Sequence, residues 1–278
     1  MARSKMWALA GAASALALVL TACSSPSGTP APGGGGEKIK IGIKFDQPGL
    51  GVQEGNTFTG FDVEVAKYVA KEMGYAENQI EFVEAKSPQR ETMIQADQVK
   101  LIFATYSITD ARKEKVSFAG PYFIAGQDLL VRTDDTSITG PDSLAGKKVC
   151  SVAGSTPAQN IKKEQPNLDL VEYDAYSLCV SALESGGVDA VTTDNVILAG
   201  YASQPQYTGK FKVVGKPFTT ERYGVGLKKG DTATCTKVNE ALTKMVSSGA
   251  WAKALDDTAG KSGFKPDDRN PPALEACS

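Results

Sequence analysis

The sequence predicts an α/β protein of two lobes joined by two crossings of the chain. Segments patterned as strands alternate with amphipathic helical segments, which is the order of a parallel sheet with covering helices. The same order begins again after Arg132, and the segments from Tyr223 onward are expected to return to the first unit. We therefore expect lobe 1 at 37–131 plus 220–278, lobe 2 at 132–219, and a cleft between them.

The elements of lobe 1 are predicted from their apolar spacing. Ile39–Ile43 alternates with period two, so it is expected to be a strand, and the Gly- and Pro-containing run Asp46–Gly55 a loop. Phe61–Met73 has apolar residues at steps of four and is followed by Gly74, which predicts an amphipathic helix. The remaining expectations are a strand at 80–83, a helix at 90–97 and a strand buried on both faces at 99–105.

In lobe 2 the same signals predict a second, smaller sheet. Pro157 is expected to be the first residue of a helix. Strands are expected at 147–152, 168–173 and 188–193, a helix at 176–184, and a strand at 211–214 that completes the sheet. A strand at 223–227 and a helix around 239–255 are assigned to lobe 1.

The N-terminus carries an export signal. Arg3 and Lys5 precede the apolar run Met6–Leu20, and small residues follow it. Leu20–Cys23 resembles a bacterial lipobox, which implies a signal peptide at 1–22 and a lipidated Cys23 that anchors the chain to the outer face of the cell membrane. An ordinary cleaved signal and a single membrane-spanning helix remain alternatives. Residues 23–36, rich in Ser, Pro and Gly, are expected to be a flexible tether.

The composition excludes several functions. With 30 basic and 32 acidic residues the chain has no charge pattern for nucleic acid, and without histidine or a close cysteine pair no metal site is expected. Apart from Cys23 there are four cysteines, an even number in an exported chain, so two disulfides are expected among Cys150, Cys179, Cys235 and Cys277. Three pairings and four free thiols remain open, although Cys150 and Cys179 lie within one compact segment.

Polar residues follow the predicted strands of both lobes. In open α/β sheets, ligands bind beyond the carboxyl ends of the strands. A ligand that touches groups of both lobes favours their closed arrangement. The residues in such positions are Lys44, Thr105, Ser107, Gly154, Ser155, Thr156 and Asp194.

Over nearly all of the mature chain the sequence resembles the amino-acid-binding solute-binding proteins of ABC importers. The segments that carry this resemblance are Gly60–Ala66, Ser107–Arg112, Phe118–Tyr122, Gly146–Val149, Gly154–Thr156 and Val188–Asp194. It is more similar to actinobacterial glutamate-binding lipoproteins through Lys44–Gly51, Gln89–Thr92, Ala104–Ile108, Cys150–Gln159 and Tyr176–Val180. The resemblance implies a type II periplasmic-binding-protein fold, with the ligand in the cleft, and supports the pairing of Cys150 with Cys179.

The resemblance also implies a clamp for a free amino acid. Arg112 would bind the α-carboxylate bidentately, because a guanidinium fork fits a carboxylate. Ser107, Ser155 and Thr156 would help it, the last two at a helix start where unpaired N–H groups favour an anion. Asp194 would bind the α-ammonium together with the Thr105 carbonyl.

The ligand's side chain is predicted to be acidic. Family members that bind lysine-like or glutamine side chains typically have an aspartate at the position of Lys44, so the sign of the charge is reversed here. Lys44 and Arg112 in one cleft would repel unless a ligand brings a second negative charge, and Arg90 is a further candidate to meet it. The predicted site thus contains three cations, Lys44, Arg90 and Arg112, and one anion, Asp194, which matches a ligand with two negative charges and one positive charge. Alternatively, Lys44 reaches solvent and Arg112 forms a surface ion pair with Asp110 or Glu114.

The expected function is that of a lipid-anchored, monomeric receptor that captures an acidic amino acid, most simply L-glutamate, and hands it to an ABC permease and its ATPase. Gln47 and Ser87 stand where relatives often have aromatic rings, which predicts a polar, wet pocket. No cofactor and no catalysis are expected, since the chain has no P-loop and no histidine base. Glutamine or another polar amino acid as ligand, a sensing subunit, and a periplasmic dehydratase of the same fold remain alternatives.

Overall fold

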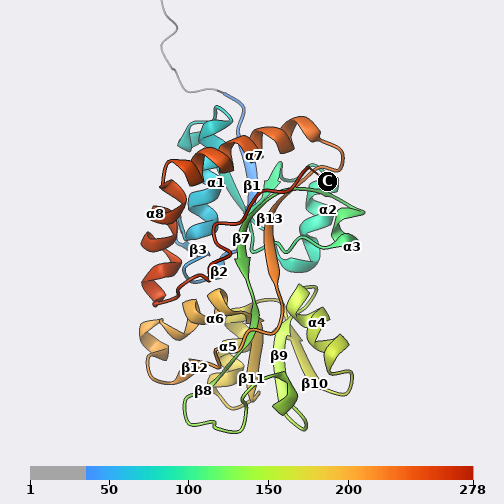
Figure 1. The fold of residues 1–278 in the computed structure, drawn as a ribbon, viewed down its shortest axis with the longest axis vertical. Coiled ribbons are helices and arrows are strands. Elements are labelled where there is room, and N and C mark those ends of the chain that lie inside the picture. The colour runs from blue at the N-terminus through green and yellow to red at the C-terminus, as the bar shows by residue number, and fades with distance from the viewer. Residues whose placement is uncertain (1–35, 278) are drawn as a thin grey trace, which may run out of the picture. The chain divides into compact units, whose positions relative to one another are not determined.

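The computed structural model describes residues 36–277, and Glu37–Ser278 form one compact unit. The expected signal peptide, Cys23 and nearly all of the tether therefore lie outside the described residues. No helix in the described part of the chain has the length and apolar character needed to cross a membrane. The compact unit contains two five-stranded sheets, each in its own lobe (Figure 1).

The sheet of lobe 1 combines parallel and antiparallel strands. Its strand order is β5-β1-β6-β13-β7. Strand β1 is parallel to β5 and β6, whereas β13 is antiparallel to β6 and β7. Ile41 and Ile43 of β1 are fully buried, as an interior strand requires. The strand bounds are β1 Ile39–Ile43, β5 Ile80–Glu84, β6 Leu101–Ile102, β7 Ser117–Ala125 and β13 Glu221–Leu227.

The helices of lobe 1 cover this sheet. Phe61, Val65 and Val69 of α1 are buried, which confirms the face predicted from the steps of four. The expected single helix at 239–255 is wrong, because the chain turns at Gly249 with φ 76° and begins a second helix. The bounds are α1 Phe61–Glu72, α2 Arg90–Gln95, α3 Asp110–Lys113, α7 Thr232–Ser247 and α8 Ala250–Asp257.

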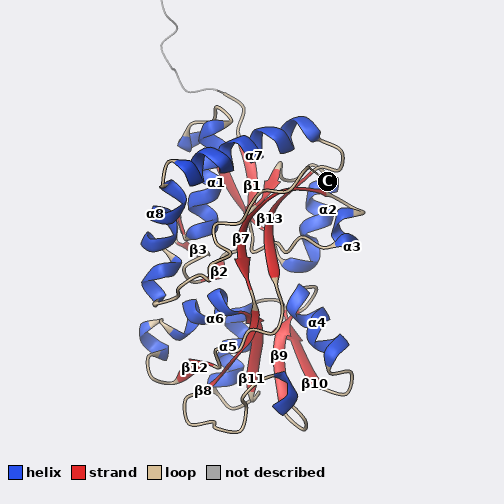
Figure 2. Cartoon of the chain, viewed as in Figure 1, coloured by secondary structure: helices blue, strands red, loops and turns tan. Residues whose placement is uncertain are grey.

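Lobe 2 also contains a five-stranded sheet, with the strand order β10-β9-β11-β8-β12. The predicted final strand does complete the sheet, by antiparallel pairing of β12 with β8. Helices α4, α5 and α6 lie beside the strands of this sheet (Figure 2). The bounds are β8 Gln127–Arg132, β9 Lys148–Val152, β10 Asp169–Tyr173, β11 Ala190–Asp194, β12 Phe211–Val213, α4 Thr156–Glu164, α5 Tyr176–Glu184 and α6 Asn195–Ala202.

The chain crosses between the lobes twice. The first crossing is at Gly126, between β7 and β8, and the second lies between β12 and β13. Because β8 pairs with β11 and β12, residues 127–131 belong to the second sheet rather than to lobe 1 as expected. Strands β7 and β13 pair side by side and both lead toward the second lobe (Figure 1). The two crossing segments, at Gly126 and between β12 and β13, form the hinge.

Two short segments differ from expectation. The predicted loop 46–55 forms most of a three-stranded sheet. The predicted strand at 99–105 pairs only as β6, because Thr105 has φ 46° and leaves the sheet. The remaining elements are β2 Asp46–Gln47, β3 Gly51–Glu54, β4 Thr57–Thr59 and the 3-10 helices Glu77–Gln79, Ser87–Gln89, Pro141–Ser143, Pro205–Tyr207 and Ala259–Ser262.

Two disulfides are present, and they confirm the expected number. Cys150 pairs with Cys179, which joins β9 to α5 in lobe 2. Cys235 pairs with Cys277, which joins α7 to the C-terminal tail. Among the pairings left open by the sequence, this is the one that the resemblance supports.

Candidate ligand-binding site

A small, nearly filled cavity of about 10 Å³ lies where the two lobes meet. All the predicted ligand residues except Arg112 and Lys44 line it. Sequence reasoning gave no role to Pro157, Tyr176, Thr193 or Ile197, although Thr193 directly precedes Asp194. The lining residues are Gln47, Ser87, Arg90, Thr105 and Ser107 of lobe 1, and Ser155, Thr156, Pro157, Tyr176, Thr193, Asp194 and Ile197 of lobe 2.

Asp194 gives the cavity an anionic group. It ends β11 and is 2% exposed, and its Oδ2 accepts a hydrogen bond of 2.6 Å from the Tyr223 hydroxyl. Its Oδ1 is buried and has no hydrogen-bond partner among the described residues. Burial raises the pKa of Asp194 well above its usual value, and the nearby charge of Glu221 raises it further. This oxygen can accept a donor from a ligand.

Thr105 presents its carbonyl in an unusual backbone conformation that a buried carboxylate holds. The Thr105 N–H donates to Asp62 Oδ2 at 2.8 Å, and the Tyr122 hydroxyl donates to Asp62 Oδ1 at 2.7 Å. Burial raises the pKa of Asp62 to about 6. The Thr105 hydroxyl lies 3.2 Å from Gln47 Oε1. The bonds to Asp62 offset the cost of a positive φ at a β-branched residue.

Arg112 spans the two lobes. Its Nη1 donates to the Ser107 carbonyl and to Thr156 Oγ1, each at 2.8 Å. Its Nε lies 3.3 Å from Glu91 Oε1, and its guanidinium stacks 4.9 Å from the centre of the Tyr106 ring. Arg112 is only 7% exposed, so the alternative of a surface ion pair is wrong. These contacts hold its fork against the protein and outside the cavity lining.

Arg90 faces the cavity as a cation without an ion pair within residues 36–277. It begins α2 and is 3% exposed, and its Nε donates to the Ala85 carbonyl at 3.3 Å. Its guanidinium lies 5.1 Å from the centre of the Tyr106 ring, on which Arg112 also stacks. The terminal nitrogens of Arg90 have no protein hydrogen bond in the described part of the chain. They are free to bind a planar anion.

Lys44 is fully buried, so the alternative that it reaches solvent is wrong. Its Nζ lies 3.6 Å from Asp46 Oδ1, and neither atom has a hydrogen-bond partner within the described residues. Burial lowers the pKa of Lys44. Three cations were expected at the ligand site. Because Lys44 is near Asp46 and Arg112 is near Glu91, Arg90 is the one of these three that has no carboxylate beside it in the described chain.

The start of α4 forms one wall of the cavity. Ser155 is its N-cap, and Ser155 Oγ accepts a hydrogen bond of 3.1 Å from the Ala158 N–H. The helix begins at Thr156, so Pro157 is the second helical residue rather than the first. Unpaired N–H groups at a helix start favour an anion, and these residues lie beside Arg112.

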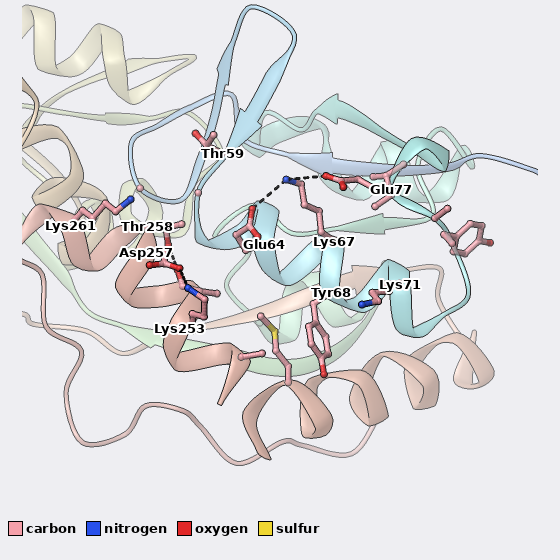
Figure 3. Close-up of a pocket in the computed structure, with 18 residues that line it drawn as sticks. Thr59, Glu64, Lys67, Tyr68, Lys71, Glu77, Lys253, Asp257, Thr258 and Lys261 are labelled. Atoms are coloured by element: carbon pink, nitrogen blue, oxygen red, sulfur yellow. Dashed lines mark hydrogen bonds and ion pairs between the residues drawn. The ribbon is translucent and has the colours of Figure 1, made fainter. Parts of the chain in front are cut away.

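A larger hollow lies on lobe 1 between α1 and α8 (Figure 3). Lys67 on its wall pairs with Glu64 at 3.3 Å and with Glu77 at 3.6 Å, and Lys253 pairs with Asp257. None of the predicted ligand residues lines this hollow. Size therefore does not identify the site, whereas buried charge and convergence of the two lobes do.

A small polar cavity enclosed by two hinged α/β lobes defines a protein that closes around a small solute. Residues 39–260 match the family described as bacterial extracellular solute-binding proteins, family 3. The chain belongs to this family, and it has the two-lobed fold of amino-acid-binding periplasmic proteins.

Relatives and solved structures agree with this assignment. The chain is 47% identical over 234 residues to the glutamate-binding protein GluB of Corynebacterium glutamicum, with 80% of this chain and 79% of that protein covered. It is 38% identical over 218 residues to the ABC transporter glutamine-binding protein GlnH of Bacillus subtilis, with 77% and 78% covered. An ancestral arginine-binding protein bound to glutamine superposes with a TM-score of 0.74 at 32% identity, with 81% and 99% covered.

Proposed function

We propose that the protein is an extracytoplasmic solute-binding protein that captures L-glutamate by closure of its lobes and delivers it to an ABC importer. The observation that carries the choice of an acidic side chain is Arg90, a buried cation that lines the cavity without an ion pair in the described chain. Similarity to the glutamate-binding protein of Corynebacterium glutamicum supports the same ligand.

The α-ammonium of the ligand binds at Asp194. The buried, unpartnered Oδ1 accepts the ammonium, and the Thr105 carbonyl is the second acceptor. A buried carboxylate without a cation is costly, and the ammonium removes that cost. Tyr223 holds the other oxygen in place.

The α-carboxylate binds between Arg112 and the start of α4. The Arg112 guanidinium bonds to groups of both lobes. A carboxylate placed beside Ser107, Ser155 and Thr156 would replace the neutral acceptors of Arg112 by a charged one, which forms the stronger hydrogen bonds. Arg112 must turn toward the cavity to do so.

The side-chain carboxylate binds Arg90. Glutamine could offer this guanidinium only one neutral oxygen, whereas glutamate offers two charged ones. Lys44 does not line the cavity and lies near Asp46, so it contributes only positive charge from outside the cavity lining. Similarity to the glutamine-binding protein of Bacillus subtilis makes glutamine the competing ligand that any test must include.

The remaining features of the proposal concern the protein's surroundings. Cys23 carries lipid that holds the protein at the outer face of the membrane, and the tether lets it reach the permease as a monomer. The protein binds glutamate without transforming it, so incubation with glutamate is expected to return the amino acid unchanged.

Titration calorimetry of the Glu37–Ser278 fragment, stripped of carried-over ligand, tests the ligand assignment. Wild type is expected to prefer glutamate over aspartate, glutamine and lysine. Arg90→Met should cost glutamate about 2 to 5 kcal/mol, as expected for a desolvated charge pair, and glutamine much less. Lys163→Met removes one exposed charge from lobe 2 and should change neither affinity. An unchanged glutamate-to-glutamine ratio in Arg90→Met would remove Arg90 from the site.

A further inference from the structure

Asp46 belongs to lobe 1, but its carboxylate binds lobe 2. It is the first residue of β2 and follows the end of β1, at Ile43, by three residues. Asp46 Oδ2 accepts from the Ser177 N–H at 3.3 Å, from the Ser177 hydroxyl at 3.4 Å, and lies 3.2 Å from the Tyr201 hydroxyl. The Tyr201 hydroxyl also bonds to the Asp46 carbonyl. Asp46 does not line the cavity.

The contact with Ser177 completes a helix of the opposite lobe. Ser177 lies in the first turn of α5, and the N-cap residue of that helix, Ala175, provides no side-chain capping bond. The first N–H groups of a helix need an acceptor, and a carboxylate there also interacts favourably with the helix dipole. Asp46 therefore supplies to α5 the cap that its own lobe lacks.

A second close contact joins the same part of lobe 1 to α6 of lobe 2. A Cβ added to Gly200 in α6 would lie 2.1 Å from the carbonyl oxygen of Pro48, two residues after Asp46. The close approach of the lobes here requires a glycine. Tyr201, the next residue of α6, is 3% exposed. Residues 46–48 of lobe 1 thus pack on both α5 and α6 of lobe 2.

Lys44 compensates the charge of this carboxylate from within lobe 1. Its Nζ lies 3.6 Å from Asp46 Oδ1, and the lysine is fully buried. Breaking contact with lobe 2 leaves Asp46 with Lys44 and water. The contacts to Ser177 and Tyr201 exist only while the lobes are together.

We propose that Asp46 is a closure latch: a positioning residue that touches no ligand, caps α5 across the cleft, and is charge-compensated by Lys44. This inference rests on the closure in the proposed function but not on the identity of the ligand. The latch should act on every ligand alike, because it adds to the stability of the closed state. Its loss should raise the dissociation rate and leave the order of ligand preference unchanged.

The test compares Asp46→Ala, Tyr201→Phe and Gly200→Ala with wild type in the Glu37–Ser278 fragment. We expect Asp46→Ala to lower the affinity for the wild type's preferred ligand about tenfold or more. The loss should come from faster dissociation, with an association rate within about threefold of wild type. The ratio between the two best ligands should stay the same. Asp174→Ala is the matched control, since Asp174 also faces lobe 1 but is exposed and lies 4.0 Å from Lys86.

Small-angle scattering of the ligand-free proteins separates this proposal from the proposed function. Asp46→Ala and Gly200→Ala should be more open than wild type even without ligand. Unchanged dissociation and unchanged scattering in Asp46→Ala, or a changed ligand preference, would overturn the latch. If wild type binds glutamine rather than glutamate, the ligand assignment fails. The dissociation rates of glutamine from wild type and Asp46→Ala then still test whether Asp46 is a latch. If Asp46→Ala does not fold, Tyr201→Phe and Gly200→Ala give the same comparison.

Discussion

Asp194, the last residue of β11, is held by Tyr223 on one carboxylate oxygen, and the other oxygen has no hydrogen-bond partner among residues 36–277. Burial and Glu221 raise its pKa, so the ligand-free protein keeps a proton there at pH values where a free aspartate has lost it. An incoming ammonium favours the ionised form. In the proposed complex, binding is therefore coupled to proton release.

This coupling predicts how affinity depends on pH. Glutamate affinity should rise with pH until Asp194 is ionised in the ligand-free protein, because less work is then needed to remove its proton. Calorimetry in buffers of different ionisation enthalpy should detect proton release below that pH. Asp194→Asn should bind weakly and release no proton from this position. Identical proton release in wild type and Asp194→Asn would contradict the assignment.

Asp62 makes a separate prediction about stability. Its pKa is raised to about 6 in the folded protein from 3.8, so as pH falls through 6 the folded state takes a proton before the unfolded state does. The free energy of unfolding should therefore increase from about pH 6 to about pH 4, by up to about 3 kcal/mol from this group. Urea unfolding of wild type and Asp62→Asn across this range would show it. Parallel curves for the two proteins would contradict it.

At the scale of elements, prediction succeeded where local pattern and packing agree. The helix predicted at 176–184 has the bounds of α5, and α1 buries the predicted stripe. Strands β7 and β8 received no prediction, because their apolar residues show no clear period and Pro121 interrupts the first of them. The shortened β6 depends on the contact of Thr105 with Asp62, which no local pattern encodes.

The candidate site shows the same division. Five of the seven residues predicted from strand ends line the cavity, since the carboxyl ends of parallel strands meet at one edge. The proximity of Lys44 to Asp46 and that of Arg112 to Glu91 arise between elements brought together by folding. The sequence therefore indicated which cations lie near the cleft, but not which of them is free.

Helix α5 connects a disulfide to the cleft. Cys179 ties it to Cys150 of β9, while Tyr176 in its first turn lines the cavity. Replacing both cysteines by alanine should lower the free energy of unfolding by about 2 to 4 kcal/mol and weaken ligand binding as well. Chemical unfolding and calorimetry would measure both effects. The Cys235/Cys277 double alanine variant is the control, because that disulfide ties the tail to α7 away from the cavity. Equal losses of affinity in the two variants would refute a specific role for α5.

At the scale of the whole molecule, both lobes contribute to the proposed ligand site. Residues of both lobes line the cavity, so a bound ligand makes contacts that an open arrangement lacks. Saturating glutamate should therefore raise the Tm of wild type, because a thousandfold excess of ligand over Kd adds about 4 kcal/mol to the free energy of unfolding. Scanning calorimetry with and without glutamate measures the shift. Arg90→Met should lose most of the glutamate effect, whereas Lys163→Met should keep it.

The most direct measurement is a crystal structure of the Glu37–Ser278 fragment with glutamate. We predict that the lobes enclose one glutamate, with its ammonium on Asp194 Oδ1, its α-carboxylate on Arg112 at the start of α4, and its side-chain carboxylate on the Arg90 guanidinium. A glutamate held in another orientation, or a side-chain carboxylate that contacts neither terminal nitrogen of Arg90, would contradict the account.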